Sequence, residues 1–143
     1  MCAIPAAIES YRGEHFDGVR ALWEEAFPDD PPHNRAGIAI PAKLAIQPEL
    51  LLVALDNGAV VGTAMAGYDG HRGWLYSIAV RRTHRRCGIG TLLVREAERR
   101  LAQLGCNKVN LQLRAENAAV AAFYRRLGYA AEERVSMGKR LAG

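Results

Sequence analysis

The chain has 143 residues, of which 50% are hydrophobic and 24% charged, and its formal net charge is +4. This length is close to the commonest domain size, so a core can form without a metal or disulfides. The composition excludes a disordered or low-complexity chain. No apolar run reaches the roughly 20 residues that cross a bilayer, and the N-terminus lacks the basic start of a secretory signal.

The cysteine content argues against metal and disulfide chemistry. Cys2, Cys87 and Cys106 form no CxxC pair, and no His/Cys cluster has metal-ligand spacing. We therefore predict no bound metal and a reduced, cytoplasmic protein.

The first half of the chain predicts a strand, two helices and a proline-rich break between the helices. Residues 6–12 suit a short strand, and residues 14–27 carry apolar side chains at three- and four-residue steps, as in an amphipathic helix. The prolines of residues 28–37 end that helix. A weaker helical segment is predicted over residues 42–46.

The middle of the chain predicts an antiparallel meander. Apolar runs at residues 50–55 and 59–65 flank Asn57-Gly58, a strong hairpin signal because both residues accept positive φ. Residues 68–73 read as the next turn. Residues 74–80 are apolar almost throughout, which predicts a strand covered on both faces near the middle of a sheet.

The last third predicts two further helices and two further strands. Residues 91–104 form a helix that ends at Gly105, with an apolar face of Leu93, Ala97, Leu101 and Leu104 and an ion pair between Glu96 and Arg100. Residues 109–113 alternate like a strand. Asn117 caps a helix that runs to Leu127, and residues 129–139 suit a final strand. The order predicts one α/β (α+β) domain over residues 1–143, with a mixed, mostly antiparallel sheet flanked by helices.

The segment after the predicted central strand has the character of an anion site. Arg85 and Arg86 precede Gly88-Ile89-Gly90, where glycines let the backbone turn sharply and approach a ligand. The helix that follows presents unpaired N–H groups and the positive end of its dipole, which suits a pyrophosphate. The basic residues of this segment are Arg81, Arg82, His84, Arg85 and Arg86. They indicate a phosphorylated small molecule, a nucleic acid or a solvated turn, but a nucleic-acid site would interleave aromatics, and residues 81–91 contain none.

Two common nucleotide motifs are absent from this loop. A Walker A loop would need GxxxxGK followed by Ser or Thr, and a Rossmann loop would need a third glycine where Leu93 stands. The pattern that remains, R/Q-x-x-G-x-G/A directly after a strand ending in Ile78-Ala79-Val80, resembles the loop that holds the pyrophosphate of coenzyme A in the GNAT acetyltransferase superfamily.

A second segment strengthens this resemblance. The run from Asn117 to Tyr129 is similar to the N-x-x-A-x-x-F-Y-x-x-L-G-F/Y segment of that family, with Val120 in place of the usual small residue. One helix and one strand separate the two motifs, as in the family. The stretches GTAMAGYDGHRG and SMGKRL resemble a small bacterial YpeA-like branch.

The resemblance implies a GNAT N-acetyltransferase that takes acetyl-CoA as acyl donor. Tyr124 would then be catalytic and protonate the leaving thiolate as a general acid, although its helical spacing alone would suit a core residue. Cys87 is read as incidental to the chemistry, because no base lies beside it in the sequence. The residues implied to contact the cofactor are Ile78, Ala79, Val80, Arg85, Arg86, Cys87, Gly88, Ile89, Gly90, Thr91 and Asn117.

The general base is not assigned. Relatives that acetylate ribosomal-protein N-termini carry a glutamate where Gln112 stands here, and an amide cannot take a proton. The substitutes left open are Glu116, Asp69, His71 and Tyr76, besides a water chain or an amine that is already neutral. Asp29 and Asp30 lie where the family walls its acceptor site, although a solvated turn accounts for them as well.

The leading hypothesis is transfer of acetyl from acetyl-CoA to a primary amine of a small molecule or protein. Its alternative among enzymes is a protein N-terminal or lysine acetyltransferase, and its alternative of another class is a non-catalytic coenzyme A-binding module. The expected partners are acetyl-CoA and an amine acceptor, with no nucleic acid and no membrane. Homodimerisation is left open.

Overall fold

The structure is a computed structural model that describes residues 6–141. The chain divides into two compact units, an N-terminal unit up to Leu111 and a C-terminal unit from Gln112 onwards. Each unit is described by itself.

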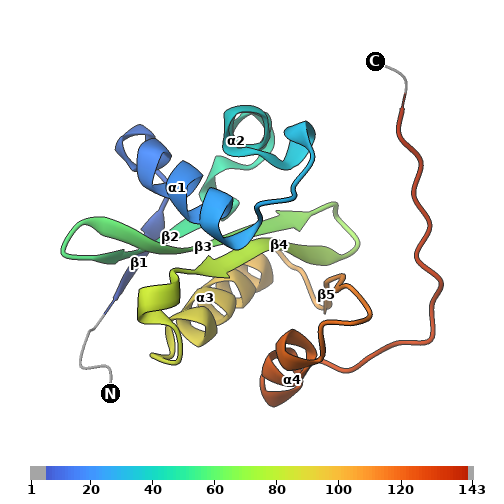
Figure 1. The fold of residues 1–143 in the computed structure, drawn as a ribbon. Coiled ribbons are helices and arrows are strands. Elements are labelled where there is room, and N and C mark those ends of the chain that lie inside the picture. Colours follow the sequence, from blue (N-terminus) through green and yellow to red (C-terminus); the bar gives the residue numbers. More distant parts are fainter. Residues whose placement is uncertain (1–5, 142–143) are drawn as a thin grey trace. The chain divides into compact units, whose positions relative to one another are not determined.

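A five-stranded sheet forms the framework of the N-terminal unit (Figure 1). The strands pair in sequence order, antiparallel from β1 to β4 and parallel between β4 and β5. Their bounds are β1 Ala7–Ser10, β2 Leu51–Asp56, β3 Ala59–Tyr68, β4 Gly73–Val80 and β5 Val109–Asn110. The predicted mixed, mostly antiparallel sheet with flanking helices is confirmed.

Helices cover both faces of this sheet. Helices α1 (Phe16–Ala26) and α2 (Ala36–Ile46) lie on one face and α3 (Ile89–Gln103) on the other (Figure 1). Strand β2 is buried along Leu51–Leu55 because alternate residues face opposite helical layers. Short 3-10 turns occupy Gly13–His15, Pro32–Asn34, Pro48–Leu50 and Arg82–His84.

In the C-terminal unit, the secondary structure of the described residues is one helix, α4 (Ala118–Arg126). The Asn117 side chain caps it by accepting a 3.3 Å hydrogen bond from the Val120 N–H, as the sequence predicted. Gly128 follows the helix with φ +98°.

The local turn chemistry was predicted correctly. Asn57 and Gly58 have φ of 50° and 83°, as a type I′ hairpin turn requires, and they join β2 to β3 with Asp56 opposite Ala59. The ion pair between Glu96 and Arg100 also forms, with 2.8 Å between Oε2 and Nε.

Several boundaries differ from the predictions. Helix α2 begins six residues before position 42 and contains Pro41, whose exposed position lets water satisfy the carbonyl that the proline leaves unbonded. Strand β4 is not covered on both faces, since Tyr76 is 48% exposed. Leu104 is 46% exposed and lies off the buried face of α3.

Of the two strands predicted in the last third of the chain, one is shorter than expected and the other is absent. β5 is limited to two residues because only Gly73 and Trp74 of β4 pair with it. Residues 129–139 contain no strand, and Val135 and Met137 are about nine-tenths exposed. An alternating pattern shows that a segment suits a sheet, but a strand forms only where a neighbour bonds its backbone.

Gly62 brings the start of α3 against the sheet. A Cβ at this position would lie 2.9 Å from Leu93 Cδ1 and 3.2 Å from both Ile89 Cγ2 and the Ala79 carbonyl oxygen. Contacts that short require the helix or β4 to move, so the missing side chain sets how closely α3 approaches β3 and β4.

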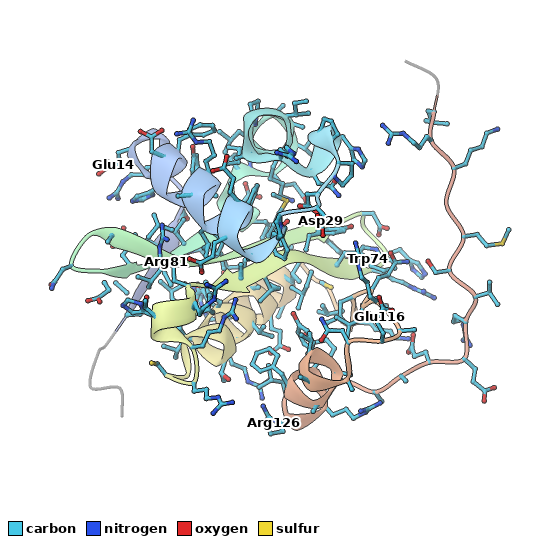
Figure 2. The ribbon with its side chains drawn as sticks, viewed as in Figure 1. Glu14, Asp29, Trp74, Arg81, Glu116 and Arg126 are labelled. Atoms are coloured by element: carbon cyan, nitrogen blue, oxygen red, sulfur yellow. The ribbon has the colours of Figure 1, made fainter. Side chains whose placement is uncertain are left out.

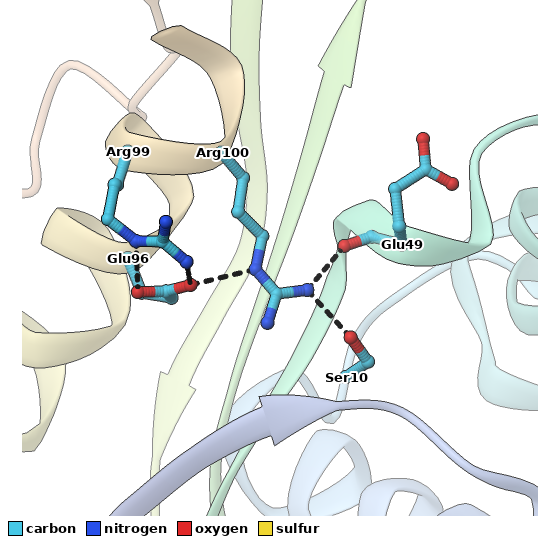
Figure 3. Close-up of polar contacts among 5 residues, drawn as sticks. All are labelled: Ser10, Glu49, Glu96, Arg99 and Arg100. Atoms are coloured by element: carbon cyan, nitrogen blue, oxygen red, sulfur yellow. Dashed lines mark hydrogen bonds and ion pairs between the residues drawn. The ribbon is translucent and has the colours of Figure 1, made fainter. Parts of the chain in front are cut away.

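A charged cluster on α3 ties the helix to two other elements (Figure 3). Glu96 accepts from Arg99 and Arg100, with Nε distances of 2.9 and 2.8 Å. Arg100 Nη1 also donates to Ser10 Oγ and the Glu49 carbonyl, each at 2.7 Å. The hydrogen bonds from Arg99 and Arg100 lower the pKa of Glu96 from 4.5 to about 2 despite its partial burial.

We predict that Glu96→Gln lowers the free energy of unfolding by about 1 kcal/mol at neutral pH. Since the folded pKa of Glu96 is depressed, its contribution is complete above pH 4.5 and is lost as the pH falls towards 2. Urea denaturation at several pH values measures this difference. Glu98→Gln, which breaks a more exposed 3.0 Å pair with Arg95, is the control and should change stability by about half as much or less. A pH-independent difference for Glu96→Gln would contradict the prediction.

Candidate functional site

Strand β4 carries a bulge close to its C-terminal end. Thr63 pairs with Ala79 and Met65 with Tyr76, so the single residue between Thr63 and Met65 faces two residues of β4, Ser77 and Ile78. Ser77 has φ +49°, a left-handed conformation that is unusual for a residue with a side chain. A bulge of this kind re-aims the backbone of a strand, here within the segment predicted to contact the cofactor.

The loop after β4 is held in place by contacts to α1, β2 and β3. The Arg81 side chain, labelled in Figure 2, donates from Nε to the Val60 carbonyl at 2.9 Å. It also lies beside Glu25 of α1, with 3.8 Å between charged atoms. The Arg82 N–H donates to Glu25 Oε2 at 2.9 Å. This bond is the main cause of a lowered pKa of Glu25, followed by the nearby arginine charges, so Glu25 is anionic.

A second anchor joins this loop to the β2–β3 hairpin. His84 Nε2 lies 2.9 Å from Asp56 Oδ2, and the other ring nitrogen lies 2.8 Å from Thr83 Oγ1. The His84 side chain is only 18% exposed. Arg81 and His84 therefore have structural contacts. Arg85 and Arg86 are more exposed, and Arg85 Nε donates to the Val80 carbonyl at 3.2 Å. The sequence did not predict the roles of Glu25 and Asp56, because they lie 57 and 28 residues from their partners.

The loop ends at an uncapped helix N-terminus. Arg86 and Gly88 have φ of 63° and 79°, and Gly88 is the N-cap residue of α3 and offers no side chain to cap the helix. Left-handed turns gather N–H groups into a concave anion site, and a 15-residue helix adds the positive end of its dipole. The chemistry of these residues fits a pyrophosphate group.

The state of Cys87 differs from the expectation. Cys87 is disulfide-bonded in the structure and Cys106 is a free thiol, whereas three reduced cysteines were predicted. Sequence spacing shows which cysteines can bind a metal together, but not which ones the fold brings within bonding distance. Cys2 lies outside the described residues. Among the described residues, no group of His, Cys, Asp and Glu side chains could hold a metal ion.

Tyr124 and Asn117 belong to the C-terminal unit. Tyr124 is 6% exposed, and its ring makes edge contacts with Phe123 and Tyr129 at centroid distances of 4.9 and 5.7 Å. Burial raises the pKa of Tyr124 to about 12, so the phenol stays protonated at neutral pH. The predicted cofactor residues from Ile78 to Thr91 all lie in the N-terminal unit.

The candidate bases differ in their surroundings. Asp69 accepts hydrogen bonds from the N–H groups of His71 and Arg72 at 2.8 and 2.7 Å, and these bonds lower its pKa. Desolvation, followed by the charge of Asp69, raises the pKa of Tyr76. Gln112 donates from Nε2 to Ser136 Oγ at 2.5 Å. None of these observations supplies a base.

Comparisons with known proteins agree with this architecture. The model of the acetyltransferase (GNAT) family matches residues 14–129. An acetyltransferase of Yersinia pestis (strain Pestoides F) is 38% identical over 136 residues, which are 94% of each chain. The aminoglycoside N-acetyltransferase AAC(6')-Iy in complex with CoA has a TM-score of 0.78 at 21% identity, covering 99% of this chain and 98% of its own. The NatC complex bound to Gag peptide and CoA has a TM-score of 0.78 at 23% identity, covering 92% and 88%.

The fold and these matches define an acyltransferase of the GNAT type. The chain belongs to the GNAT acetyltransferase family. It is an acetyl-CoA-dependent N-acetyltransferase. Over residues 6–141, no helix has the length and apolar character needed to cross a membrane.

We predict that Gly88→Val weakens acetyl-CoA binding about tenfold or more, because a β-branched residue resists the left-handed conformation that gathers the loop N–H groups. Isothermal titration calorimetry measures the affinity. Gly70→Val is the matched control, since Gly70 has a similar φ of +89° and an equally open surrounding in a different turn. Equal affinity losses in both variants, or none in Gly88→Val while circular dichroism is native, would contradict an anion site at this loop.

Proposed function

We propose that this enzyme transfers the acetyl group of acetyl-CoA to a primary amine of a small molecule or a protein. The observation that carries the proposal is the uncapped start of α3, with left-handed Arg86 and Gly88, directly behind the bulged end of β4. This arrangement offers a pyrophosphate site and, beside it, strand backbone for the pantetheine arm and the thioester.

In this proposal the cofactor lies along one continuous segment. The β4 residues Ile78, Ala79 and Val80 contact the pantetheine arm, and the N–H groups at the start of α3 bind the pyrophosphate. Asn117 contributes a further contact besides its capping role. The residues proposed to line the pyrophosphate are Arg85, Arg86, Cys87, Gly88, Ile89, Gly90 and Thr91.

The proposed chemistry is direct attack of the neutral amine on the thioester carbonyl. The carbon–nitrogen bond forms as the carbonyl oxygen becomes negative, and a backbone N–H of the β4 bulge stabilises that oxygen. When the carbon–sulfur bond breaks, Tyr124 gives its proton to the thiolate. Tyr124 is protonated at neutral pH, as a general acid must be before the thiolate forms. We propose that residues 1–143 act as one catalytic domain.

A missing carboxylate bears on the choice of acceptor. A protonated amine must lose a proton before it attacks the thioester, so an enzyme acting on it benefits from a base. Gln112 offers none and bonds Ser136 instead. This weakens the alternative of N-terminal acetylation of the ribosomal-protein type, whose enzymes carry a glutamate at this position. A cytoplasmic location stays a prediction from the sequence.

We predict that acetyl-CoA raises the melting temperature, because a ligand that binds only the native state stabilises it. ATP and NADH should shift it much less, since the loop lacks their motifs. Release of free thiol is then measured with a panel of small amines, peptides with free N-termini and lysine peptides. Turnover confined to the peptides would favour the alternative of protein N-terminal or lysine acetylation, and a shift with no turnover on any amine would contradict the proposed function.

We predict that Tyr124→Phe lowers kcat by about tenfold or more while the affinity for acetyl-CoA changes by about threefold or less. The variant keeps the ring packing and removes only the proton donor. Thiol release is measured with the best acceptor under conditions where chemistry limits the rate.

The control for this variant is Tyr129→Phe, which removes the hydroxyl of the neighbouring ring. It should leave kcat nearly unchanged. A wild-type kcat in Tyr124→Phe would remove Tyr124 from the mechanism and leave the proposed cofactor contacts intact.

A further inference from the structure

A buried chain of hydrogen bonds links α1 to the bulge of β4. Trp23 Nε1 donates to Thr63 Oγ1 at 2.8 Å, and Thr63 Oγ1 donates its own proton to the Ser77 carbonyl at 2.9 Å. Trp23 is 4% exposed and Thr63 is fully buried. Because the indole can only donate, it makes the threonine oxygen an acceptor and directs the hydroxyl proton to Ser77.

The bond from Thr63 ends at the strained residue of the bulge. Ser77 adopts φ +49° although it has a side chain, and such a conformation persists only where neighbouring groups hold it. The Thr63 hydroxyl bonds the carbonyl of that same residue. The hydroxyl therefore stabilises the bulged conformation directly, besides satisfying buried polar groups.

Holding the Ser77 carbonyl also fixes the N–H of the next residue. The described residues contain no cis peptide bond, so the Ser77 carbonyl and the Ile78 N–H point in opposite directions across one planar peptide. With the carbonyl turned towards Thr63, the Ile78 N–H points away from Thr63 and Trp23. The ladder between β4 and β5 comprises only Gly73 and Trp74, so it does not extend to Ile78.

We propose that Trp23 and Thr63 are positioning residues for the acetyl-transfer step. Through the Ser77 carbonyl they aim the Ile78 N–H, which serves as the donor to the oxygen that becomes negative when the amine adds to the thioester. This inference rests on the proposed function and adds the residues that set the direction of its backbone donor. Neither residue contacts the substrate.

Thr63→Val tests the proposal because valine keeps the shape of threonine and removes the hydroxyl. The expected result is a fall in kcat of about tenfold or more with KM for acetyl-CoA within about threefold, since the lost interaction belongs to the transition state. Thr63→Ser restores the hydroxyl and should return kcat to within about threefold of the wild type. Wild-type kcat in a folded Thr63→Val variant overturns the proposal.

A purely structural role would give a different pattern. Val19→Ala is the matched control, because Val19 is fully buried in α1 and its truncation lowers stability without touching the bulge. Its melting temperature should fall while kcat stays within about twofold of the wild type. An equal loss of kcat in Val19→Ala and Thr63→Val would assign the effect to general destabilisation and overturn the proposal.

If Thr63→Val does not fold, Trp23→Phe decides the question. It keeps an aromatic ring and the Thr63 hydroxyl but removes the donor that orients it, so kcat should fall about threefold or more. An unchanged kcat overturns the proposal.

Amide hydrogen exchange provides a readout that needs no turnover. Saturating acetyl-CoA should slow exchange of the Ile78 N–H in the wild type, and less so in Thr63→Val, or in Trp23→Phe where Thr63→Val does not fold. Equal slowing in wild type and variant overturns the proposal. Failure of the proposed function is distinguishable, because it appears as wild-type protein that binds acetyl-CoA and acetylates no amine.

Discussion

The close contact between the start of α3 and the middle of β3 is the constraint on which the anion site depends. Gly62 allows Ile89 and Leu93 to pack where a methyl group would already be too near. The position of the first turn of α3 is thereby fixed relative to the end of β4. A helix dipole acts only within about one turn of the helix end, so a small displacement of α3 would remove much of its effect on a bound anion.

Strand β4, which leads into this site, is irregular near its C-terminal end. A regular β4 would direct its backbone groups alternately to β3 and to the opposite edge, and the bulge at Ser77 and Ile78 breaks that alternation. Thr63 and Trp23 secure the bulge from one side of the sheet, while Glu25 and Asp56 secure the following loop. Rigid surroundings therefore hold the two irregular segments whose backbone groups would meet the cofactor, as preorganised catalysis requires.

Features set by neighbouring residues were predictable from the sequence. Asn57-Gly58 specifies its hairpin turn, Asn117 caps α4, and the glycines after Arg86 mark the start of α3. Features set by residues far apart in the sequence were not predictable. Trp23 and Thr63 are 40 positions apart, and no local pattern distinguishes them from ordinary core residues. The strand predicted at 109–113 is present only over Val109–Asn110, and the one predicted at 129–139 is absent, because pairing depends on a partner strand that composition does not reveal.

The pKa shifts leave a protonated phenol at Tyr124 for the proposed reaction, but they give no candidate base more basic character at neutral pH. Burial raises the pKa of Tyr124 to about 12, so the phenol is protonated at neutral pH. The candidate bases whose pKa is shifted do not gain basic character at neutral pH. Hydrogen bonds lower the pKa of Asp69, and desolvation raises that of Tyr76, so the first binds protons weakly and the second already carries one. In the proposed mechanism the protein supplies an acid and a backbone donor, and neutralisation of the amine is left to solvent or to the acceptor itself. An acceptor with a low amine pKa suits such a site best, because more of it is neutral before it binds.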